Sequence, residues 1–573
     1  MYNGTGASSG IGIGKAVIVE DVQLVITRQE VADTGSEVQR FKGALDQAIL
    51  DTERLAEDLA TRVGEKEAEI MQGHMMLLGD PMLTGEIENA IKNEKVNSEF
   101  AIENVCNMYA DMFASMGDEL MQQRATDMRD IKTRMQKILM GIQSVDISAL
   151  PEGSIIVAKD LTPSMTAGIN PANVTGIVTE LGGRTSHSAI LARALEIPAV
   201  VAVGGVMDNV KDGDSIVLDG TTGEVFVNPE AAVKAQYEEK REQFLKEKKE
   251  LEQYIGKPSV TKDGVQVEIV ANIGKPEDVD KVLQYDGEGI GLFRTEFLFM
   301  DRNAMPTEEE QFEAYKKVAV AMNGKPVIIR TLDIGGDKEI PYMGLEKDEN
   351  PFLGYRAIRF CLDRKEDIYK PQLRALLRAS AFGNIRIMIP LVTCIDEYRE
   401  ARALVEELKA ELDGKGIAYK KDIQVGIMVE TAAASLIADI FAKEADFFSI
   451  GTNDLTQYTM SVDRGNKKIS YLYSTFNPAV LRSIRHIIAC GRAEGIMVGM
   501  CGEAASDPMM IPLLLAFGLN EFSMSASAIL RARKMVTEYS VQELQAVADK
   551  AMSFATTAEV EQYMKEFVES GTV

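Results

Sequence analysis

The residue types with the clearest chemical meaning in this chain surround one histidine. The run from Gly182 to Arg193 reads GGRTSHSAILAR and places His187 where a glycine-rich loop meets an expected helix over 189–195. Glycines let another group approach the backbone closely, and the unpaired N–H groups at a helix start favour an anion. The pattern therefore indicates a histidine that carries a phosphoryl group. The alternative is an imidazole that only caps a helix, the commoner role of a lone histidine.

A second set of polar residues follows short apolar runs in the C-terminal half. Arg294 and Arg330 offer forked donors that suit a ligand carrying both a carboxylate and a phosphate. Glu430 and Asp454 end consecutive runs and can supply two oxygens to Mg²⁺, which takes one or two carboxylates in proteins. The set indicates a site for a small phosphorylated acid. Its other members, at or near the same positions, are Asn272, Glu296, Asp333, Arg356, Asn453, Arg464, Cys501 and Glu503.

Five cysteines are scattered without C-x-x-C spacing, which indicates reduced thiols and neither a disulfide framework nor a zinc site. Cys501 lies among the expected anion ligands. It is either a proton donor or a small buried residue, and burial is the commoner fate of a free cysteine.

Composition limits the partners. The formal charge of −26 repels nucleic acid and anionic lipid, whereas it attracts a small basic protein. No apolar run approaches the roughly 20 residues that span a bilayer, and the N-terminus lacks a basic region followed by an apolar stretch. We therefore expect a cytoplasmic protein that neither binds nucleic acid nor inserts into a membrane. At 573 residues, three or four domains are expected.

The histidine is expected in a β-rich domain with an insertion. A strand-like segment over 1–30, which includes Ala16–Val19 and Leu24–Ile26, precedes a helical stripe from Ser36 onward. We assign 1–30 and 145–229 to a phosphohistidine α/β domain and 31–144 to an inserted helical subdomain. Expected helices cover 67–78, 98–113 and 118–142, and expected strands cover 154–158, 174–178, 199–203, 215–218 and 224–227.

The second expected helix ends in a methionine-rich tip, 73–81, stopped by a glycine and a proline. Such a stripe is usually core, and the alternative is an adaptable docking surface. His74, within this tip, gives little functional information by itself.

A charged segment without Gly or Pro, 230–260, is expected to form a linker helix with a hinge at its end. The remaining residues, 261–573, alternate eight strand-like runs with amphipathic segments, which predicts a (β/α)₈ TIM barrel. The polar set described above lies at the carboxyl ends of these strands, where such barrels keep their active sites. The runs are 265–273, 289–294, 326–332, 385–391, 425–429, 447–450, 497–500 and 521–524.

Several long motifs carry a resemblance that runs from end to end. Besides the histidine loop they are 124–130 (RATDMRD), 332–338 (LDIGGDK), 449–458 (SIGTNDLTQY) and 499–503 (GMCGE). Together they resemble the Enzyme I family of the bacterial sugar phosphotransferase system, the phosphoenolpyruvate-protein phosphotransferases. A departure from the pattern at 504–507 (AASD), where many relatives have a glycine before the acidic residue, touches no expected ligand.

The resemblance implies a role for each motif. His187 accepts phosphate from phosphoenolpyruvate and passes it to the phosphocarrier protein HPr, in the first step of sugar uptake. Thr166 orients that histidine, and Cys501 protonates the enolate to give pyruvate. The helical subdomain is implied to dock HPr, and the barrel to form a homodimer. The implied substrate contacts are Arg294, Arg330, Asn453, Asp454 and Arg464, and the implied Mg²⁺ ligands, with Mn²⁺ as an alternative ion, are Glu430 and Asp454.

Two other functions stay open from the residues. Pyruvate phosphate dikinase and phosphoenolpyruvate synthase share the histidine domain and the barrel, but they need an ATP-binding domain for which no stretch remains and no G-x-x-x-x-G-K-[ST] loop is present. The other alternative is a catalytically inactive regulator that senses phosphoenolpyruvate. The presence of His187, the arginines and both carboxylates argues against it.

Overall fold

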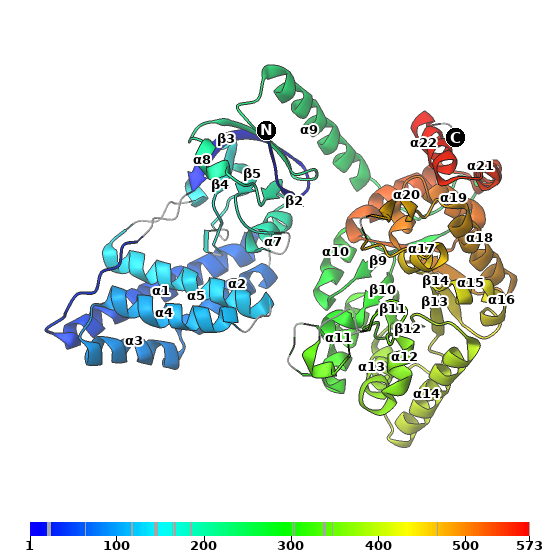
Figure 1. Cartoon of the computed structure of the whole chain (residues 1–573), viewed down its shortest axis with the longest axis horizontal. Helices are drawn as coiled ribbons and strands as arrows, with labels where there is room; N and C mark the ends of the chain where they lie inside the picture. Colours follow the sequence, from blue (N-terminus) through cyan, green and yellow to red (C-terminus); the bar gives the residue numbers. More distant parts are fainter. Residues whose placement is uncertain are drawn as a thin grey trace. The chain divides into compact units, whose positions relative to one another are not determined.

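The computed structural model describes residues 1–19, 24–62, 65–115, 119–142, 147–162, 164–165, 168–183, 186–300, 302, 304–335, 340–346, 348–466 and 468–571. The chain forms two compact units, Met1–Lys248 and Lys249–Val573 (Figure 1). Thr166, Arg184 and Thr185 lie outside the described residues, as does the side chain of His187.

The first unit contains a mixed sheet built from both ends of its sequence. Over the described residues the strand order is β1-β8-β7-β3-β4-β5-β6-β2. The pairs from β3 to β6 are parallel, and the remaining pairs are antiparallel. The first three strands therefore need partners from beyond residue 150 to be buried. The strands are β1 (Tyr2–Asn3), β2 (Thr5–Ser8), β3 (Ile11–Val19), β4 (Ser154–Ala158), β5 (Val174–Thr179), β6 (Ala199–Val201), β7 (Ser215–Asp219) and β8 (Glu224–Val227).

Two helices cover this sheet, each over its own apolar cluster. Helix α7 (His187–Ala194) contributes Ala189 and Ala192 to one cluster, and α8 (Val206–Asn209) contributes Val206 to the other. Strands from β4 to β6 alternate between the two clusters, as the period of two along a strand requires. The sheet is therefore buried on both faces, and the first residue of α7 is the histidine.

A helical bundle lies between β3 and β4 in the sequence (Figure 1). Its helices are α1 (Thr34–Arg62), α2 (Glu65–Leu78), α3 (Pro81–Glu94), α4 (Ser98–Ser115) and α5 (Glu119–Met140), which pack around a single apolar cluster.

Helix α3 was not predicted, because Pro81 was interpreted as a stop. In the structure Pro81 is instead the first helical residue, where its missing N–H costs nothing. Asp80 is the N-cap, and its Oδ1 accepts the Met82 N–H at 2.8 Å. The helix then buries Leu83, Ile87 and Ile91 at intervals of four residues.

The strand predicted over Leu24–Ile26 is wrong. No strand of the sheet lies beside this segment, so it cannot join a ladder. The chain pairs instead with the loop before α4: Gln29 N–H donates to Asn97 Oδ1 at 2.9 Å, and Asn97 N–H donates to the Gln29 carbonyl at 3.1 Å. These bonds attach the first segment to the bundle.

The predicted linker helix is α9 (Ala231–Glu252), which spans the boundary between the two units. Its first half is anchored to the first unit by Tyr237, which is buried. The Tyr237 hydroxyl donates to Glu224 Oε2 at 2.8 Å, and its ring centroid lies 5.2 Å from that of Phe226.

The second unit contains the predicted TIM barrel, which confirms the fold class. In its described part the parallel strands close in the order β9 to β16, with β16 pairing back onto β9. Each strand lies within or beside a predicted apolar run. The strands are β9 (Glu268–Ile273), β10 (Ile290–Arg294), β11 (Pro326–Arg330), β12 (Asn384–Ile389), β13 (Val425–Val429), β14 (Phe447–Ile450), β15 (Met497–Met500) and β16 (Glu521–Met524).

Helices surround the strands and supply the outer half of one large apolar cluster (Figure 1). They are α10 (Val279–Gln284), α11 (Glu308–Ala321), α12 (Ile358–Asp363), α13 (Lys370–Ala379), α14 (Ile395–Gly414), α15 (Ala432–Leu436), α16 (Ala438–Phe441), α17 (Thr452–Met460), α18 (Pro478–Ala493), α19 (Ile511–Phe517), α20 (Ile529–Glu538), α21 (Val541–Ser553) and α22 (Thr557–Ser570).

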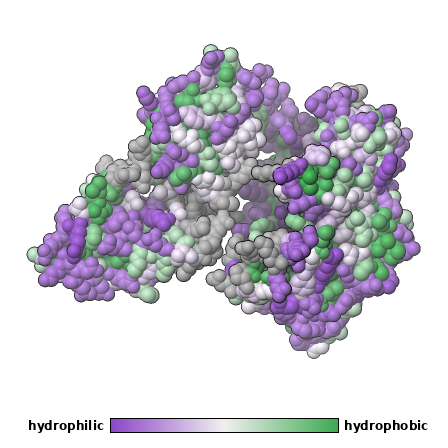
Figure 2. Space-filling model, viewed as in Figure 1, coloured by the Kyte–Doolittle hydropathy of each residue, from purple (hydrophilic) through white to green (hydrophobic). Residues whose placement is uncertain are grey.

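Hydrophilic side chains cover most of the face seen in Figure 2, with smaller apolar areas between them. Among the helices in the described ranges, none combines the length and apolarity needed to cross a bilayer.

One fully buried arginine fixes the start of the barrel. Arg533 on α20 has a side chain with no exposed surface. Its Nη1 lies 2.7 Å from Asp286 Oδ2 and donates to the Tyr254 carbonyl at 3.0 Å, while its Nε donates to Ser259 Oγ at 3.2 Å. The guanidinium thus joins the segment before β9, the loop before β10 and α20.

We expect Arg533→Ala to lower the free energy of unfolding by about 3 kcal/mol, because it leaves Asp286 without its cation and opens a cavity. Lys534→Ala is the matched control, since the Lys534 Nζ–Glu250 Oε2 pair is 3.6 Å apart and partly exposed, and it should cost below about 1 kcal/mol. Urea unfolding of the full chain measures both. Equal losses would contradict a structural role specific to Arg533.

Candidate active site

Arg330 is the centre of the polar rim at the carboxyl ends of the barrel strands. It is the last residue of β11 and is buried. Its Nη2 lies 2.9 Å from Glu296 Oε1, in the turn after β10, and its Nη1 lies 3.0 Å from Asp333 Oδ2. Burial lowers the pKa of this guanidinium, but Glu296 and Asp333 outweigh burial and hold the pKa above its ordinary value. Arg330 is therefore a fixed cation.

Asp333 links Arg330 to a second buried arginine. Arg356 donates to Asp333 Oδ1 from Nη2 at 2.7 Å and from Nε at 3.2 Å. The Asp333 N–H in turn donates to Glu296 Oε1 at 3.0 Å. Cations and anions thus alternate from Glu296 through Arg330 and Asp333 to Arg356, and each holds its neighbours in place.

Glu430 and Asp454 form a second acidic group on the same rim. Glu430 follows β13 and is 1% exposed, and its Oε1 accepts the Leu391 N–H at 2.7 Å. Asp454, in the first turn of α17, is 9% exposed, and its Oδ1 has no hydrogen-bond partner among the described residues. Burial, then the charges of Asp454 and Asp333, raise the pKa of Glu430 well above its ordinary value.

This pair is suited to a divalent cation. Asp454 has a buried carboxylate oxygen without a partner, and the pKa of Glu430 is raised by its neighbours. A cation that binds between these two carboxyls offsets both costs. The described residues contain no cluster of three or more His, Cys, Asp or Glu that forms a complete metal cage. Two carboxylates with the rest of the shell from substrate oxygens and water is the usual Mg²⁺ arrangement.

Cys501 follows β15 and is 5% exposed. Its N–H donates to the Ile450 carbonyl at 3.1 Å, and Asn272 Nδ2 donates to its carbonyl at 3.0 Å. Burial raises the pKa of the thiol to about 11, Ser449 opposes the rise and Glu430 adds to it. The thiol is therefore protonated at neutral pH, as a proton donor requires.

Three further predicted contacts lie at or after strand ends of the same rim. Arg294 ends β10, is exposed, and its charge lowers the pKa of Cys501. Arg464, also exposed, lies after α17, and its backbone N–H donates to Gln457 Oε1 at 3.1 Å. Asn453 is half-buried in α17, and its carbonyl accepts the Tyr473 hydroxyl at 3.1 Å. These side chains can contact an incoming ligand because they take no part in the buried arginine–carboxylate network.

Two glycines that make room for the rim were not singled out from the sequence. A Cβ at Gly451 would stand 2.7 Å from Glu430 Oε2, and a Cβ at Gly502 would stand 1.7 Å from Thr452 Oγ1. Gly451 directly follows β14 and Gly502 stands two residues after β15, and this position just beyond a strand end is the signal that could have identified them.

His187 lies in the first unit as the first residue of α7. Ser186 is the N-cap, with its Oγ 3.4 Å from the Ala189 nitrogen, and Gly182 has a positive φ of +96° in the preceding turn. The backbone therefore has the glycine loop and helix start that the sequence predicted. Leu191 packs against Ala56 and Met71 of the bundle.

His74 is not at an exposed tip. The imidazole is fully buried, with Nε2 3.2 Å from Asp127 Oδ1 and Nδ1 3.8 Å from Asp130 Oδ2. Asp130 also accepts from the Ser164 N–H at 3.0 Å and from its hydroxyl at 2.8 Å. His74 thus belongs to the packing of α2 against α5, whereas Met76 beside it is 76% exposed.

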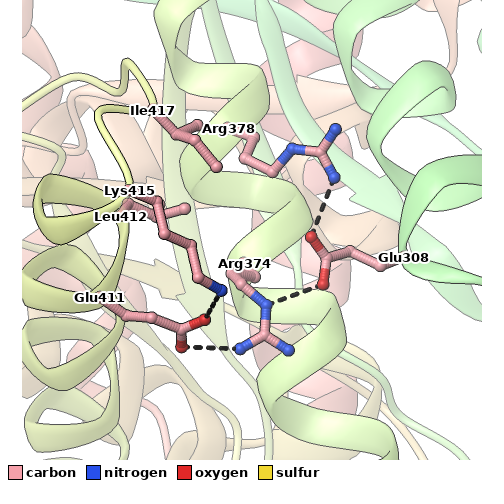
Figure 3. A pocket seen from close by; sticks show the side chains of 7 residues that line it. All are labelled: Glu308, Arg374, Arg378, Glu411, Leu412, Lys415 and Ile417. Atoms are coloured by element: carbon pink, nitrogen blue, oxygen red, sulfur yellow. Dashed lines mark hydrogen bonds and ion pairs between the residues drawn. The ribbon is translucent and has the colours of Figure 1, made fainter.

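A pocket of about 410 Å³ lies away from the rim, between α11, α13 and α14 (Figure 3). Its charges pair with one another: Arg374 Nε lies 2.7 Å and Arg378 Nη1 2.9 Å from Glu308, and Lys415 Nζ lies 2.5 Å from Glu411. The side chains that line this pocket form a network of ion pairs between helices, and none of the predicted site residues lines it.

Comparison with known proteins gives matches along most of the chain. Three family models match: "PEP-utilising enzyme, N-terminal" over residues 3–124, "PEP-utilising enzyme, mobile domain" over 150–223, and "PEP-utilising enzyme, PEP-binding domain" over 248–541.

Curated relatives match over nearly the whole chain. The phosphoenolpyruvate-protein phosphotransferase of Staphylococcus carnosus is 49% identical over 100% of this chain and 99% of its own. That of Bacillus subtilis is 48% identical over 98% of this chain and 99% of its own. A solved structure of an Enzyme I protein is 39% identical and covers 43% of this chain and 99% of its own, with a TM-score of 0.39.

The raised pKa of Glu430 predicts a pH effect on stability. Because the folded pKa exceeds the unfolded one, the folded state holds the extra proton, so stability is fully present below the unfolded pKa and falls as pH rises towards the folded pKa. In metal-free buffer, Glu430→Gln should therefore lose stability less steeply than the wild type as pH rises from about 5 to 8. The melting temperature measures this, and Glu503→Gln, exposed on the same rim, should keep the wild-type slope.

Proposed function

The chain belongs to the phosphoenolpyruvate-protein phosphotransferases, enzymes of the transferase class, and we propose that it moves a phosphoryl group from phosphoenolpyruvate to His187 and then to HPr. The observation that supports this most directly is the buried arginine–carboxylate chain beside Glu430 and Asp454 at the barrel rim.

Phosphoenolpyruvate carries a carboxylate and a phosphate, and it needs several cations held at fixed positions. We assign Arg330 to this role, because two carboxylates fix its guanidinium before the substrate arrives. Arg294, Arg464 and Asn453, which take no part in the buried arginine–carboxylate network, complete the substrate contacts. Preorganised charges of this kind stabilise a transition state without reorganisation at the moment of reaction.

Glu430 and Asp454 would hold Mg²⁺, with Mn²⁺ as the alternative ion, at the unpartnered Asp454 Oδ1 and the buried Glu430 carboxylate. When bound, the ion neutralises charge on the transferring phosphoryl group.

Cys501 is proposed to complete the reaction on the substrate. Loss of the phosphoryl group leaves the enolate of pyruvate, and the Cys501 thiol gives its proton to the enolate carbon. The thiol pKa of about 11 keeps that proton available at neutral pH.

The acceptor is His187, whose neutral imidazole attacks phosphorus with Thr166 orienting it. We assign residues 1–30 and 145–229 to this histidine domain, 31–144 to HPr binding, 230–260 to the linker, and 261–573 to phosphoenolpyruvate binding and dimerisation. A cytoplasmic location is part of the same proposal.

We expect His187→Ala to abolish phosphorylation of the protein by phosphoenolpyruvate, because the nucleophile is lost, while binding of phosphoenolpyruvate to the barrel changes less than threefold. Mass spectrometry should find one added phosphoryl group on the wild type and none on the variant, and calorimetry should find binding to both. Label on His74 or His486 in the variant would sink the assignment.

Cys501→Ala should keep substrate binding but lower kcat by roughly 10²-fold, since general acid catalysis is typically worth 10²–10⁴-fold. Cys106→Ala is the matched control, because Cys106 is also a buried thiol but lies in α4 of the helical bundle, outside the barrel. Full activity of Cys501→Ala would leave burial as the only role of this thiol.

A further inference from the structure

The bore of the barrel contains an apolar layer directly below the rim. Leu292 of β10, Ile328 of β11 and Phe447 of β14 cluster with Cys501 after β15. Since β10 and β14 lie on opposite sides of the closed barrel, Leu292 and Phe447 meet only through its interior. The layer separates the rim from the amino ends of the strands.

A buried carboxyl on the same bore has no hydrogen-bond partner among the described residues. Glu521, the first residue of β16, is 0% exposed, and neither of its oxygens makes a hydrogen bond within the described part of the chain. Its neighbour in the sheet register is Glu268, which is only half-buried, and the charge of Arg386 also acts on it. Unpartnered buried carboxyls are rare in native proteins and need an explanation.

The apolar layer is interrupted on the wall formed by β14, β15 and β16. Ser449, Gly499 and Glu521 are register partners on these strands, so their side-chain positions face the bore together. A Cβ at Gly499 would stand 2.7 Å from Glu521 Oε1, so the carboxyl occupies the space of the missing side chain.

The polar wall leads to Cys501. This cysteine lies two residues beyond Gly499 on the same face of the strand, about 7 Å along it. The Ser449 hydroxyl, which is buried and unpartnered in the described part of the structure, lies close enough to the thiol to lower its pKa. Three groups able to carry a proton therefore line one wall of the bore, with no hydrogen bond between Ser449 and Glu521 in the described structure.

We propose that Glu521 returns a proton to Cys501 through the Ser449 hydroxyl after each turnover, and that it recovers one from solvent through Glu268. The inference rests on the acid role proposed for Cys501. The proton balance is simple: the thiolate takes the Ser449 proton as Ser449 takes that of Glu521, which leaves a thiol and a carboxylate. Water at the amino ends of the strands then protonates Glu268, which passes the proton to Glu521.

The direction of transfer agrees with the acidities. Burial, then Glu268, raise the pKa of Glu521 to about 8, with Arg386 opposing, while the pKa of the thiol is about 11. The thiol is thus the weaker acid of the two, so a proton on Glu521 moves to the thiolate, and Glu521 is largely neutral at pH 7. Glu268 also has a raised pKa, caused first by burial, with Arg386 opposing and Glu288 adding to the rise.

The test uses the full-length enzyme with phosphoenolpyruvate, pyruvate and Mg²⁺ in D₂O. Two rates are measured: His187 phosphorylation in the first turnover, and deuterium entry into the pyruvate methyl group at equilibrium. In Glu521→Gln the thiol still holds its first proton, so phosphorylation should stay within twofold of the wild type. Deuterium entry should fall at least tenfold, because the thiol no longer exchanges its proton with solvent.

Ser449→Ala should reproduce this split, and thermal unfolding should verify that both variants fold. Tyr369→Phe removes another buried unpartnered hydroxyl outside the bore and should change neither rate. The relay is wrong if deuterium entry in Glu521→Gln stays within twofold of the wild type, if both rates fall equally, or if Ser449→Ala exchanges normally.

Cys501→Ala in the same assay separates this inference from the proposed function. If it exchanges deuterium at the wild-type rate, the acid role of Cys501 fails and the relay fails with it. If Cys501→Ala loses exchange while Glu521→Gln does not, only the relay is overturned.

Discussion

The pairing of buried arginines with carboxylates from neighbouring strand ends is the interaction on which this barrel's rim depends. Arg330 and Arg356 could not stay in a water-poor rim without Glu296 and Asp333, because an unpaired buried charge is costly. A closed parallel barrel supplies these partners, since the carboxyl ends of all its strands meet at one edge. The same pairing fixes Arg330 before any ligand arrives, which lowers the cost of binding an anion.

The side chains of the rim do not balance all of its buried negative charge by themselves. Glu430 and Asp454 add two carboxyls to the network, and the raised pKa of Glu430 reports their mutual repulsion in a buried place. Such a site favours a cation, and a cation here in turn favours the phosphate of the substrate. The rim therefore binds an anion and a cation together more readily than it binds either ion alone. This property suits a ligand that arrives as an anion with a divalent ion.

The sequence predicted the barrel well because its strands are short apolar runs followed by polar residues, a local pattern. It failed where a local rule has two meanings. Pro81 can stop a helix or begin one, and only Asp80 and the buried stripe after it decide. Residues 24–26 have strand composition, but strand formation requires a neighbouring strand. Gly451 and Gly502 were missed because their importance depends on Glu430 and Thr452, which oppose them only in the folded barrel.

In the proposed reaction, burial and acid catalysis are one property of Cys501 and not alternatives. Burial is what holds the thiol pKa near 11 and keeps its proton at neutral pH. The same burial separates the thiol from bulk water, so a thiolate formed in the reaction is slow to recover a proton from solvent. If only apolar side chains filled the barrel, the thiolate would recover a proton from solvent even more slowly. The polar wall of Ser449, Gly499 and Glu521 interrupts the apolar layer on the side where Cys501 lies, which is where the proposed relay would return that proton.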